Sequence, residues 1–489
     1  MTDESPFDLG LSVGSRGGRG KVDRRLAMNA IWLFAGQTTA LAAGIFVVAV
    51  TSRTFGAGDF GQLRLAQALA ALVIVVGDLG LSGLAIRQIA RDPAAVADYG
   101  WPVIALRALV TVPVAAATVA VVGLAGSADA TIVAVVLLTA VAAASNVTYV
   151  FIAMEEAAAI SRLRIVSQVV LVAAVVLGAL VVHSLLAVAA ALVLAATVNA
   201  GPPLQWASRR KFLSRSAPTR SSARHLLQRG VPFLGSALAI QVVLNGSTIV
   251  LGAVKGTGVL GLFAAPYALA SYALLLGGAI MGAAYPRIAS HWVTREHTKS
   301  LMTELCAVMG VLGIGIAVSM FVLADQALPF LFGDEFAGQA PVLRLLTVIP
   351  LLGYLNMTLG QAMVAQGSER MAMGVAWASA GISVIVAIVA TPTLGGVGAA
   401  LAAVAAEVVA LAGYVIAMLD RESMAYVRSY AAELPVALLI GLVLFGATLV
   451  GAPFPLAVAL GVAAFAVLAW IGGSTGLRAL VRVIHEGVS

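Results

Sequence analysis

Fourteen separate apolar stretches, each close to the length of a bilayer-spanning helix, run through the chain from end to end. A helix needs about 20 apolar residues to cross roughly 30 Å of hydrocarbon. The pattern therefore predicts an all-α polytopic membrane protein of about 14 transmembrane helices. We expect the spans near residues 29–51, 65–86, 102–125, 130–152, 163–182, 184–206, 231–253, 262–285, 300–324, 341–365, 371–391, 395–418, 434–451 and 455–474.

Basic residues lie mostly on every second loop, which predicts how the chain is oriented. If the N-terminus is cytoplasmic, 24 of the 29 Lys and Arg residues lie on the cytoplasmic side. Arg53, Arg64, Lys255 and Arg344 lie at the outer ends of spans, and Arg107 lies inside one. The positive-inside rule then predicts that both termini are cytoplasmic. The net charge of +7 indicates topology and contact with anionic membrane lipids, and no nucleic acid partner.

The composition leaves no stretch polar enough for a separate soluble domain, because 61% of the residues are hydrophobic and only 10% are charged. Five segments are expected along the chain. They are a disordered cytoplasmic tail, a first six-helix bundle, a basic cytoplasmic linker, a second six-helix bundle, and two further helices with a cytoplasmic tail: residues 1–28, 29–206, 207–230, 231–418 and 419–489.

An internal repeat links the two predicted bundles. A shift of 200 residues places Gly56, Gly58 and Gly61 over Gly256, Gly258 and Gly261, and Arg87 over Arg287. Glycines at three matched positions suggest that the same tight turn is built twice. The offset is six spans, an even number, so the two halves have the same orientation in the membrane. Halves of this kind are related by an axis along the membrane normal, with the substrate path between them.

Few residues in the chain suit catalysis or metal binding. Cys306 is the single cysteine, and the five histidines are scattered without metal-ligand spacing. The longest outer connection, residues 324–340, carries only Asp325, Asp334 and Glu335 as acids. Chemistry on a sugar would need a sizeable outer loop with acids and bases. We therefore expect no enzyme activity, no cofactor and no metal.

Several short motifs resemble those of a known transporter family. They are Asn29-Ala30-Ile31-Trp32 with Gly36-Gln37, Arg53-Thr54-Phe55-Gly56 with Asp59-Phe60-Gly61, Asp78-Leu79-Gly80-Leu81 with Arg87-Gln88-Ile89-Ala90-Arg91, Leu331-Phe332-Gly333-Asp334-Glu335-Phe336, and the segment 395–407. Together they cover nearly the whole membrane region in order. The chain is thus similar to the Wzx-like polysaccharide (oligosaccharide-lipid) flippases, a branch of the multidrug, oligosaccharidyl-lipid and polysaccharide exporter superfamily.

This resemblance implies a fold and a function. The fold is two pseudo-symmetric six-helix bundles in a V around a central cavity, with spans 13 and 14 as an added pair. The function is to move an isoprenoid-pyrophosphate-linked oligosaccharide from the inner to the outer leaflet of a bacterial or archaeal plasma membrane, by alternating access, for cell-surface polysaccharide assembly. A polysaccharide polymerase and glycosyltransferases are the protein partners that it implies.

Two alternatives stay open on the sequence alone. One is a non-catalytic membrane scaffold of a polysaccharide assembly complex, and the other is a cation-coupled exporter of small amphiphiles. Two departures count against neighbouring branches of the superfamily. The lipid II flippase branch has an Arg-Asp pair in the first helix where Val47-Val48 stand here, and the cation-coupled drug exporters carry an acid in that helix, whereas residues 29–51 hold no charge.

Polar side chains within the spans are the candidate site residues. Ionisable groups in a membrane are costly and therefore mark functional sites or buried pairs. For Arg107 and Arg344 we favour extension of the side chain to the headgroups. Arg53 and Arg87 are expected to contact the phosphate end of the substrate, with anchoring at the headgroups as the alternative. Six amides could face sugar hydroxyls or, alternatively, form hydrogen bonds between helices: Gln37, Asn146, Gln241, Asn245, Asn356 and Gln361. Glu407 and Asp78 are the candidates for ion coupling, with Glu407 nearer mid-membrane.

Overall fold

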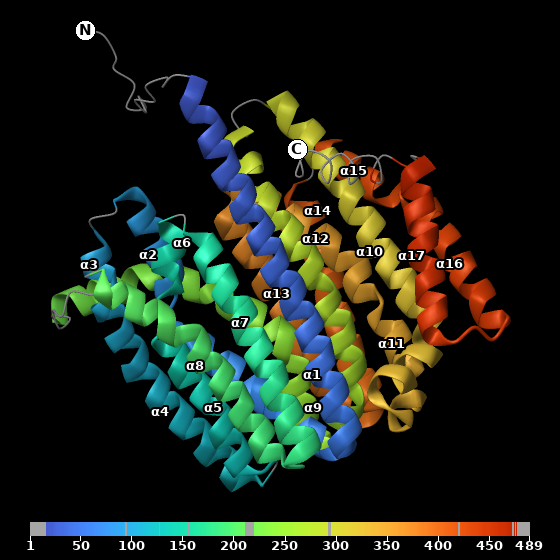
Figure 1. Ribbon diagram of the computed structural model, residues 1–489, viewed down its shortest axis with the longest axis horizontal. Helices are drawn as coiled ribbons and strands as arrows, with labels where there is room; N and C mark the ends of the chain where they lie inside the picture. Colours follow the sequence, from blue (N-terminus) through green and yellow to red (C-terminus); the bar gives the residue numbers. More distant parts are fainter. Residues whose placement is uncertain are drawn as a thin grey trace.

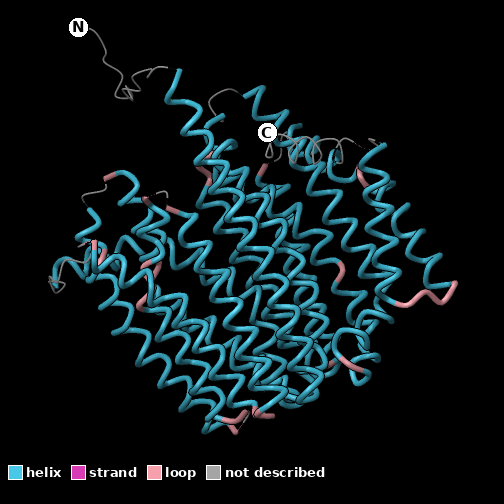
Figure 2. Tube along the Cα trace, in the orientation of Figure 1, coloured by secondary structure: helices cyan, strands magenta, loops and turns pink. Residues whose placement is uncertain are grey.

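The computed structural model describes residues 16–92, 95–126, 128–154, 156–210, 220–291, 295–418 and 421–471, together with Ser474 and Gly476. All regular structure in these ranges is helical (Figure 2). The elements in chain order are α1 (Arg16–Asp78), α2 (Leu81–Arg91), α3 (Val96–Tyr99), α4 (Trp101–Ala125), α5 (Ala130–Ala144), α6 (Thr148–Ala153), α7 (Ala157–Val176), the π-helix η2 (Leu177–Val181), α8 (Leu185–Arg209), α9 (Arg220–His291), α10 (Arg295–Phe332), the 3₁₀-helix η3 (Asp334–Gln339), α11 (Ala340–Leu346), α12 (Val348–Ala365), α13 (Glu369–Leu394), α14 (Gly396–Ala417), α15 (Arg421–Ala431), α16 (Leu434–Leu449) and α17 (Phe454–Ile471).

Eleven helical stretches in the described ranges are long and apolar enough to cross a membrane. Two of them, 35–78 and 226–281, are much longer than one crossing and contain a kink. Each covers two of the predicted spans, while 454–468 is a shorter apolar helix where the last span is expected. Hydrocarbon offers no hydrogen-bond partners to the backbone, whereas a helix pairs its own N–H and C=O groups. This explains why the apolar runs are helical. The all-helical membrane fold is confirmed, and the number 14 stays a prediction.

Helix α1 starts earlier than the sequence indicates. It begins at Arg16, so residues 16–28 are helical, although the sequence predicts a disordered tail up to residue 28. A helix extends easily once a stable span has nucleated it, and this explains the difference. Residues 1–15 and the middle of the basic linker, 211–219, lie outside the described residues.

Helices α1 and α9 run side by side through the middle of the molecule (Figure 1). Most of α2 to α8 lies on one side of this pair, and most of α10 to α17 lies on the other. We call these sides the N-half, which includes α1, and the C-half, which includes α9. Inside the N-half, Val133, Val136 and Val188 belong to one apolar core that joins α5 and α8. A second core lies between the halves and contains both Phe60 of α1 and Phe263 of α9.

The two ends of the helical bundle are given names for the following sections. The terminal face is the end at which α1 begins, at Arg16, and α17 ends, at Ile471 (Figure 1). The kink face is the opposite end, where α1 is kinked at Gly56 and α9 at Gly256. On the terminal face the halves also touch, since a Cβ on Gly80 would lie 2.2 Å from the carbonyl oxygen of Gly230.

Candidate functional site

The kinks in α1 and α9 have the same backbone conformation. Gly56 has φ 71° and ψ −178°, and Gly256 has φ 79° and ψ 176°. L-residues rarely adopt this region, whereas glycine has no Cβ to clash there. The same turn is therefore built twice, 200 residues apart, as the matched glycines indicate.

Next to the kinks, the two halves approach each other at a second pair of matched glycines. A Cβ on Gly61 would lie 1.9 Å from the carbonyl oxygen of Thr257, and a Cβ on Gly261 would lie 1.8 Å from that of Ala57. The contact is reciprocal, because Ala57 and Thr257 are themselves matched positions. Backbone thus meets backbone directly across the kink face, and no side chain of any size fits at either glycine.

Arg53 lies one turn before the first kink and reaches across to the end of α10. Its Nε donates a hydrogen bond to the carbonyl oxygen of Leu331 at 3.0 Å, and its Nη2 donates to those of Pro329, at 3.2 Å, and Phe330. The last carbonyls of a helix have no partner within the helix and carry partial negative charge. The exposed Arg53 guanidinium therefore caps a helix of the other half.

Glu335 makes the converse contact. It lies in η3, just after α10, and its Oε2 accepts a hydrogen bond from the backbone N–H of Ala57 at 3.1 Å. The kink at Gly56 interrupts the helical hydrogen bonds, so the N–H of Ala57 needs an outside acceptor. Phe336 packs edge-on against Phe60 of α1, with ring centroids 6.3 Å apart.

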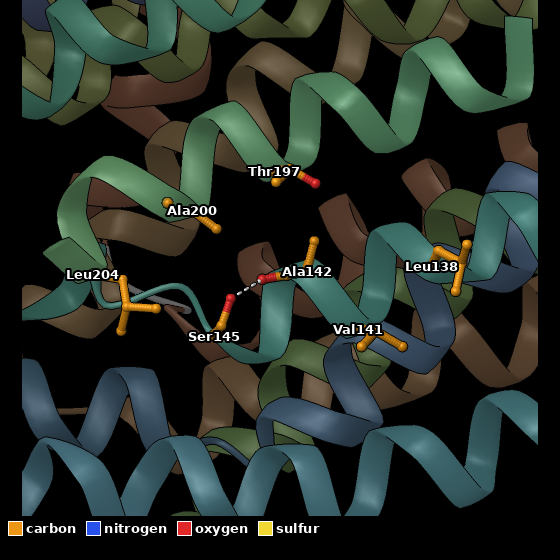
Figure 3. Close-up of a pocket in the computed structure, with 8 residues that line it drawn as sticks. Leu138, Val141, Ala142, Ser145, Thr197, Ala200 and Leu204 are labelled. Atoms are coloured by element: carbon orange, nitrogen blue, oxygen red, sulfur yellow. Dashed lines mark hydrogen bonds between the residues drawn. The ribbon is translucent and has the colours of Figure 1, made fainter.

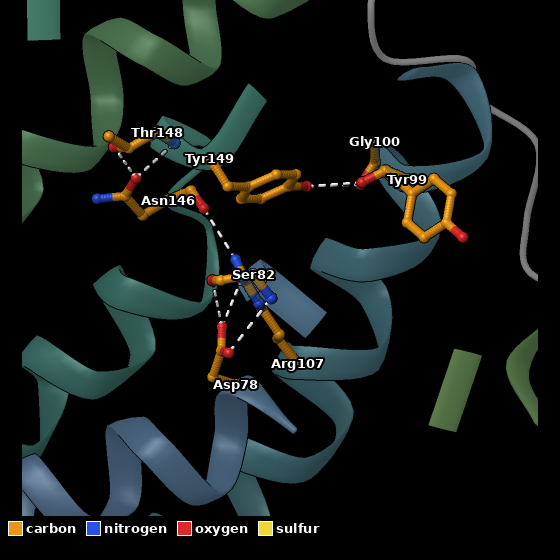
Figure 4. Close-up of polar contacts among 8 residues, drawn as sticks. All are labelled: Asp78, Ser82, Tyr99, Gly100, Arg107, Asn146, Thr148 and Tyr149. Carbon is orange, nitrogen blue, oxygen red and sulfur yellow. Dashed lines mark hydrogen bonds and ion pairs between the residues drawn. The ribbon is translucent and has the colours of Figure 1, made fainter. Parts of the chain in front are cut away.

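A polar cluster lies within the N-half, where Asp78 ends α1 (Figure 4). The Asp78 Oδ1 is 2.5 Å from Nη2 of Arg107, and it accepts a hydrogen bond from Oγ of Ser82 at 2.6 Å. The Arg107 guanidinium also donates to Ser82 Oγ and, at 2.9 Å, to the carbonyl oxygen of Asn146, and it stands over the Tyr149 ring at 4.9 Å. The cluster joins α1, α2, α4 and the break between α5 and α6.

The prediction that Arg107 extends to the headgroups is wrong. Its side chain is only 3% exposed, against 26% for its partner Asp78. A buried charge is stable in a membrane when it has a counter-charge and hydrogen-bond acceptors, and Arg107 has both. Arg344, for which the same extension was expected, is half-buried on α11 and pairs with the exposed Asp325.

The second membrane acid, Glu407, lies in α14 of the C-half. Asn356 of α12 donates through Nδ2 to the Glu407 Oε2 at 2.7 Å and to its backbone carbonyl oxygen at 2.9 Å. No ion pair to Glu407 occurs within the described part of the chain. The Oδ1 of Asn356 is buried and likewise has no hydrogen-bond partner there. The two acids thus differ, since Asp78 has an arginine and Glu407 has an amide.

The remaining predicted site residues lie in separate places. The Asn146 side chain is engaged in a local hydrogen bond, in which its Oδ1 accepts from the N–H of Thr148 at 2.8 Å. Asn245 donates to Gln241 Oε1, one turn earlier on α9, at 2.8 Å. Gln37 on α1 and Gln361 on α12 are partly buried, and Arg87 on α2 is exposed. The Oε1 of Gln37 is buried and has no hydrogen-bond partner among the described residues.

Arg53 and Arg87 are not brought together. From the kink at Gly56, α1 continues for about 22 residues to Asp78, which is roughly 33 Å at 1.5 Å per residue, and Arg87 lies further along the chain in α2. Arg87 therefore lies toward the terminal face and Arg53 at the kink face. The sequence missed the roles of Glu335 and of Arg107. A signal for Arg107 was present, because an arginine and an acid were both predicted within the first three spans.

A groove of about 490 Å³ opens between α5 and α8 of the N-half (Figure 3). Its walls are mostly apolar, and its two hydroxyls are already used, by Ser145 to the carbonyl oxygen of Ala142 and by Thr197 to that of Val193. The lining residues are Leu138, Val141, Ala142, Ser145, Thr197, Ala200, Gly201 and Leu204. None of the predicted site residues lines it.

The chain matches the model of a known family. The model of a family described as polysaccharide biosynthesis protein matches residues 26–292, more than half of the chain. The matched region contains the N-half from residue 26 onward, the linker and α9, the kinked helix of the C-half, and so it includes both copies of the kink. No curated protein matches the chain.

Solved structures share the fold at low sequence identity. A lipid II flippase, MurJ, in an inward closed conformation gives a TM-score of 0.68 at 12% identity, over 90% of this chain and 98% of that one. An outward-facing multidrug resistance MATE family transporter of the MOP superfamily gives 0.56 at 15%, over 82% and 96%. A eukaryotic MATE transporter, AtDTX14, gives 0.58 at 13%, over 84% and 99%.

Proposed function

Since this chain belongs to the polysaccharide biosynthesis protein family, we propose that it moves an isoprenoid-pyrophosphate-linked oligosaccharide between membrane leaflets by alternating access. The observation that carries the proposal is the repeated, kinked helix pair within the family match. Two halves of equal orientation meet along α1 and α9, and such halves can separate first at one face and then at the other. The fold shared with a lipid II flippase supports this assignment.

The terminal face is proposed to be cytoplasmic. If this face is cytoplasmic, 24 of the 29 basic residues are expected on the cytoplasmic side, where anionic lipid attracts them. Loading then takes place at the terminal face and release at the kink face. The two halves are in contact at both faces, with Gly80 close to Gly230 at the terminal face and Gly61 close to Gly261 at the kink face. These contacts fit a closed stage of such a cycle.

Arg53 and Arg87 are proposed to contact the pyrophosphate at the two ends of its path. Both side chains are exposed, and a guanidinium binds phosphate oxygens in a bidentate manner without losing its charge. Arg87 would meet the phosphates near the loading side and Arg53 near the release side. The partly buried amides would supply hydrogen bonds to sugars, above all Gln37, whose Oε1 has no hydrogen-bond partner among the described residues.

Substitution of these arginines tests the proposal. We expect Arg87→Ala and Arg53→Ala, each with normal membrane abundance, to abolish export of the glycan, and the corresponding Lys variants to retain part of it. Arg91→Ala is the matched control, because Arg91 is exposed on the same helix one turn after Arg87. Full export in both Ala variants would show that these side chains do not handle the substrate.

A cation-coupled exporter of small amphiphiles is the second candidate. It is favoured by the fold shared with MATE transporters and by Glu407, an acid in a membrane helix whose described partner is an amide rather than a cation. A carboxylate in that setting can exchange a proton or bind a cation at low cost to its neighbours. The same acid could couple a glycan flippase to an ion gradient, so ion dependence alone does not separate the two candidates.

A further inference from the structure

We propose that Arg53 and Glu335 form a clasp that holds the kink face shut, and that both of its contacts must break in each transport cycle. Arg53 belongs to the N-half and caps α10 of the C-half. Glu335 belongs to the C-half and caps the kink of α1 in the N-half. The two side chains thus cross the interface in opposite directions within a few residues of each other.

The contacts suit a reversible closure. Each is a charged side chain bound to backbone groups that a helix end or a kink leaves free, so neither charge is trapped when the halves separate. Arg53 is exposed and Glu335 is exposed, so water can replace the lost hydrogen bonds. A buried ion pair such as that of Asp78 and Arg107 would instead resist separation.

The clasp has a surface to close on. Gly61 and Gly261 let the two backbones meet directly, and Leu65, one turn further, is 4% exposed and packs against Gly252 of α9. These contacts are apolar or between small groups, so they give close packing but little directional hold. The hydrogen bonds of Arg53 and Glu335 provide the orientation that keeps the packed surfaces in register.

The clasp also gives each of two sequence motifs a partner. The Arg53-Thr54-Phe55-Gly56 segment supplies the guanidinium and the kink, and the Leu331 to Phe336 segment supplies the carbonyl groups and the carboxylate. Gly333 joins them at φ 104°, with the position of a Cβ only 3.6 Å from Cγ of Arg53. The residues that contact each other in these two motifs are 276 to 278 positions apart in the sequence. Together the two motifs form the clasp.

Cysteine accessibility tests the clasp without any transport assay. In a Cys306→Ala background, Leu65→Cys reports whether the buried surface opens, and Thr131→Cys, at an exposed position just after the α4–α5 turn, reports constant access from the kink face. Intact cells are treated with a membrane-impermeant maleimide. We expect Leu65→Cys to react slowly in the parent and about tenfold faster after Glu335→Ala, which removes one charged hydrogen bond. The increase after Arg53→Ala should be at least as large, because that change removes three.

Matched controls separate the clasp from a general loss of structure. Arg344→Ala removes a basic side chain whose pair with Asp325 stays within the C-half, and it should leave Leu65→Cys slow. Gly261→Ala inserts a methyl group against the Ala57 carbonyl and should speed Leu65→Cys, whereas Gly258→Ala enters open space and should not. In every variant the rate at Thr131→Cys should be unchanged.

Two results would overturn the proposal. One is a slow Leu65→Cys in both Arg53→Ala and Glu335→Ala while Gly261→Ala speeds it, since packing alone would then hold the face shut. The other is an equal increase in Arg344→Ala. Should the Ala variants be poorly folded, Arg53→Lys and Glu335→Gln keep a donor or an acceptor and should give intermediate rates. The proposal rests on the proposed function for its transport cycle, but the labelling rates need no substrate, so either can fail alone.

Discussion

The buried ion pair between Asp78 and Arg107 should be a main stabilising contact of the N-half. We expect Arg107→Met to lower the free energy of unfolding by about 3 kcal/mol, because removal of one partner of a buried pair leaves the other charge uncompensated. Loss of one partner of a buried pair costs about 3 to 5 kcal/mol in general. The lower value applies here, since Asp78 is 26% exposed and keeps its hydrogen bond to Ser82. The change also removes the hydrogen bond to the Asn146 carbonyl oxygen.

The measurement is unfolding of the purified protein in mixed micelles by titration with a denaturing detergent. Arg344→Met is the control for loss of an arginine and an ion pair. Its side chain is 35% exposed and that of Asp325 is 65% exposed, so its loss should cost less than about 1 kcal/mol. The double variant Asp78→Leu with Arg107→Met should recover most of the lost stability, because a buried pair replaced by apolar side chains is often neutral. Equal losses in Arg107→Met and Arg344→Met, or no recovery in the double variant, would refute the reasoning.

Three further outcomes are expected. Glu407→Gln should fold and bind substrate but lose the dependence of transport on a proton or sodium gradient, whereas Glu369→Gln, an exposed acid at the start of α13, should keep it; unchanged ion dependence in reconstituted Glu407→Gln would exclude the coupling role. Ser216→Cys should resist an impermeant thiol reagent in intact cells, and labelling there would reverse the orientation. Tyr149→Phe removes a hydrogen bond of 2.7 Å to the carbonyl oxygen of Tyr99 and should lower the free energy of unfolding by about 1 kcal/mol in the same titration. An unchanged free energy of unfolding would contradict this hydrogen bond.

The features that could be predicted from the sequence are those that depend on local chain properties. Apolar runs predict helices because every helix in hydrocarbon must satisfy its own backbone. The kinks at Gly56 and Gly256 could be predicted because a positive φ selects glycine, and the shift of 200 residues makes the same selection visible twice. The family resemblance is confirmed at the level of the family, and three of the five quoted motifs lie within the matched residues 26–292.

The features that could not be predicted depend on which distant segments meet. The sequence of its helix alone favours the headgroups for Arg107, because it does not reveal that Asp78 and Ser82 lie beside this side chain. Glu335 lies in an outer connection and in one of the quoted motifs, but its acceptor role requires α10 to end next to the kink of α1, 278 positions away, and the sequence does not reveal this. Asn356 and Glu407 were both candidates, but their hydrogen bond joins α12 to α14 and follows only from the packing of the C-half.

Transfer of a lipid-linked glycan in a purified system tests the central claim most directly. The protein is reconstituted into liposomes that contain an isoprenoid-pyrophosphate oligosaccharide, and an impermeant enzyme that cleaves the glycan measures how fast molecules from the protected leaflet become accessible. We predict a rate well above that of protein-free liposomes, reduced to the protein-free level by Arg87→Ala and kept by Arg91→Ala. A rate equal to that of protein-free liposomes, in a preparation that accumulates a small amphiphilic cation, would contradict the flippase and establish the exporter.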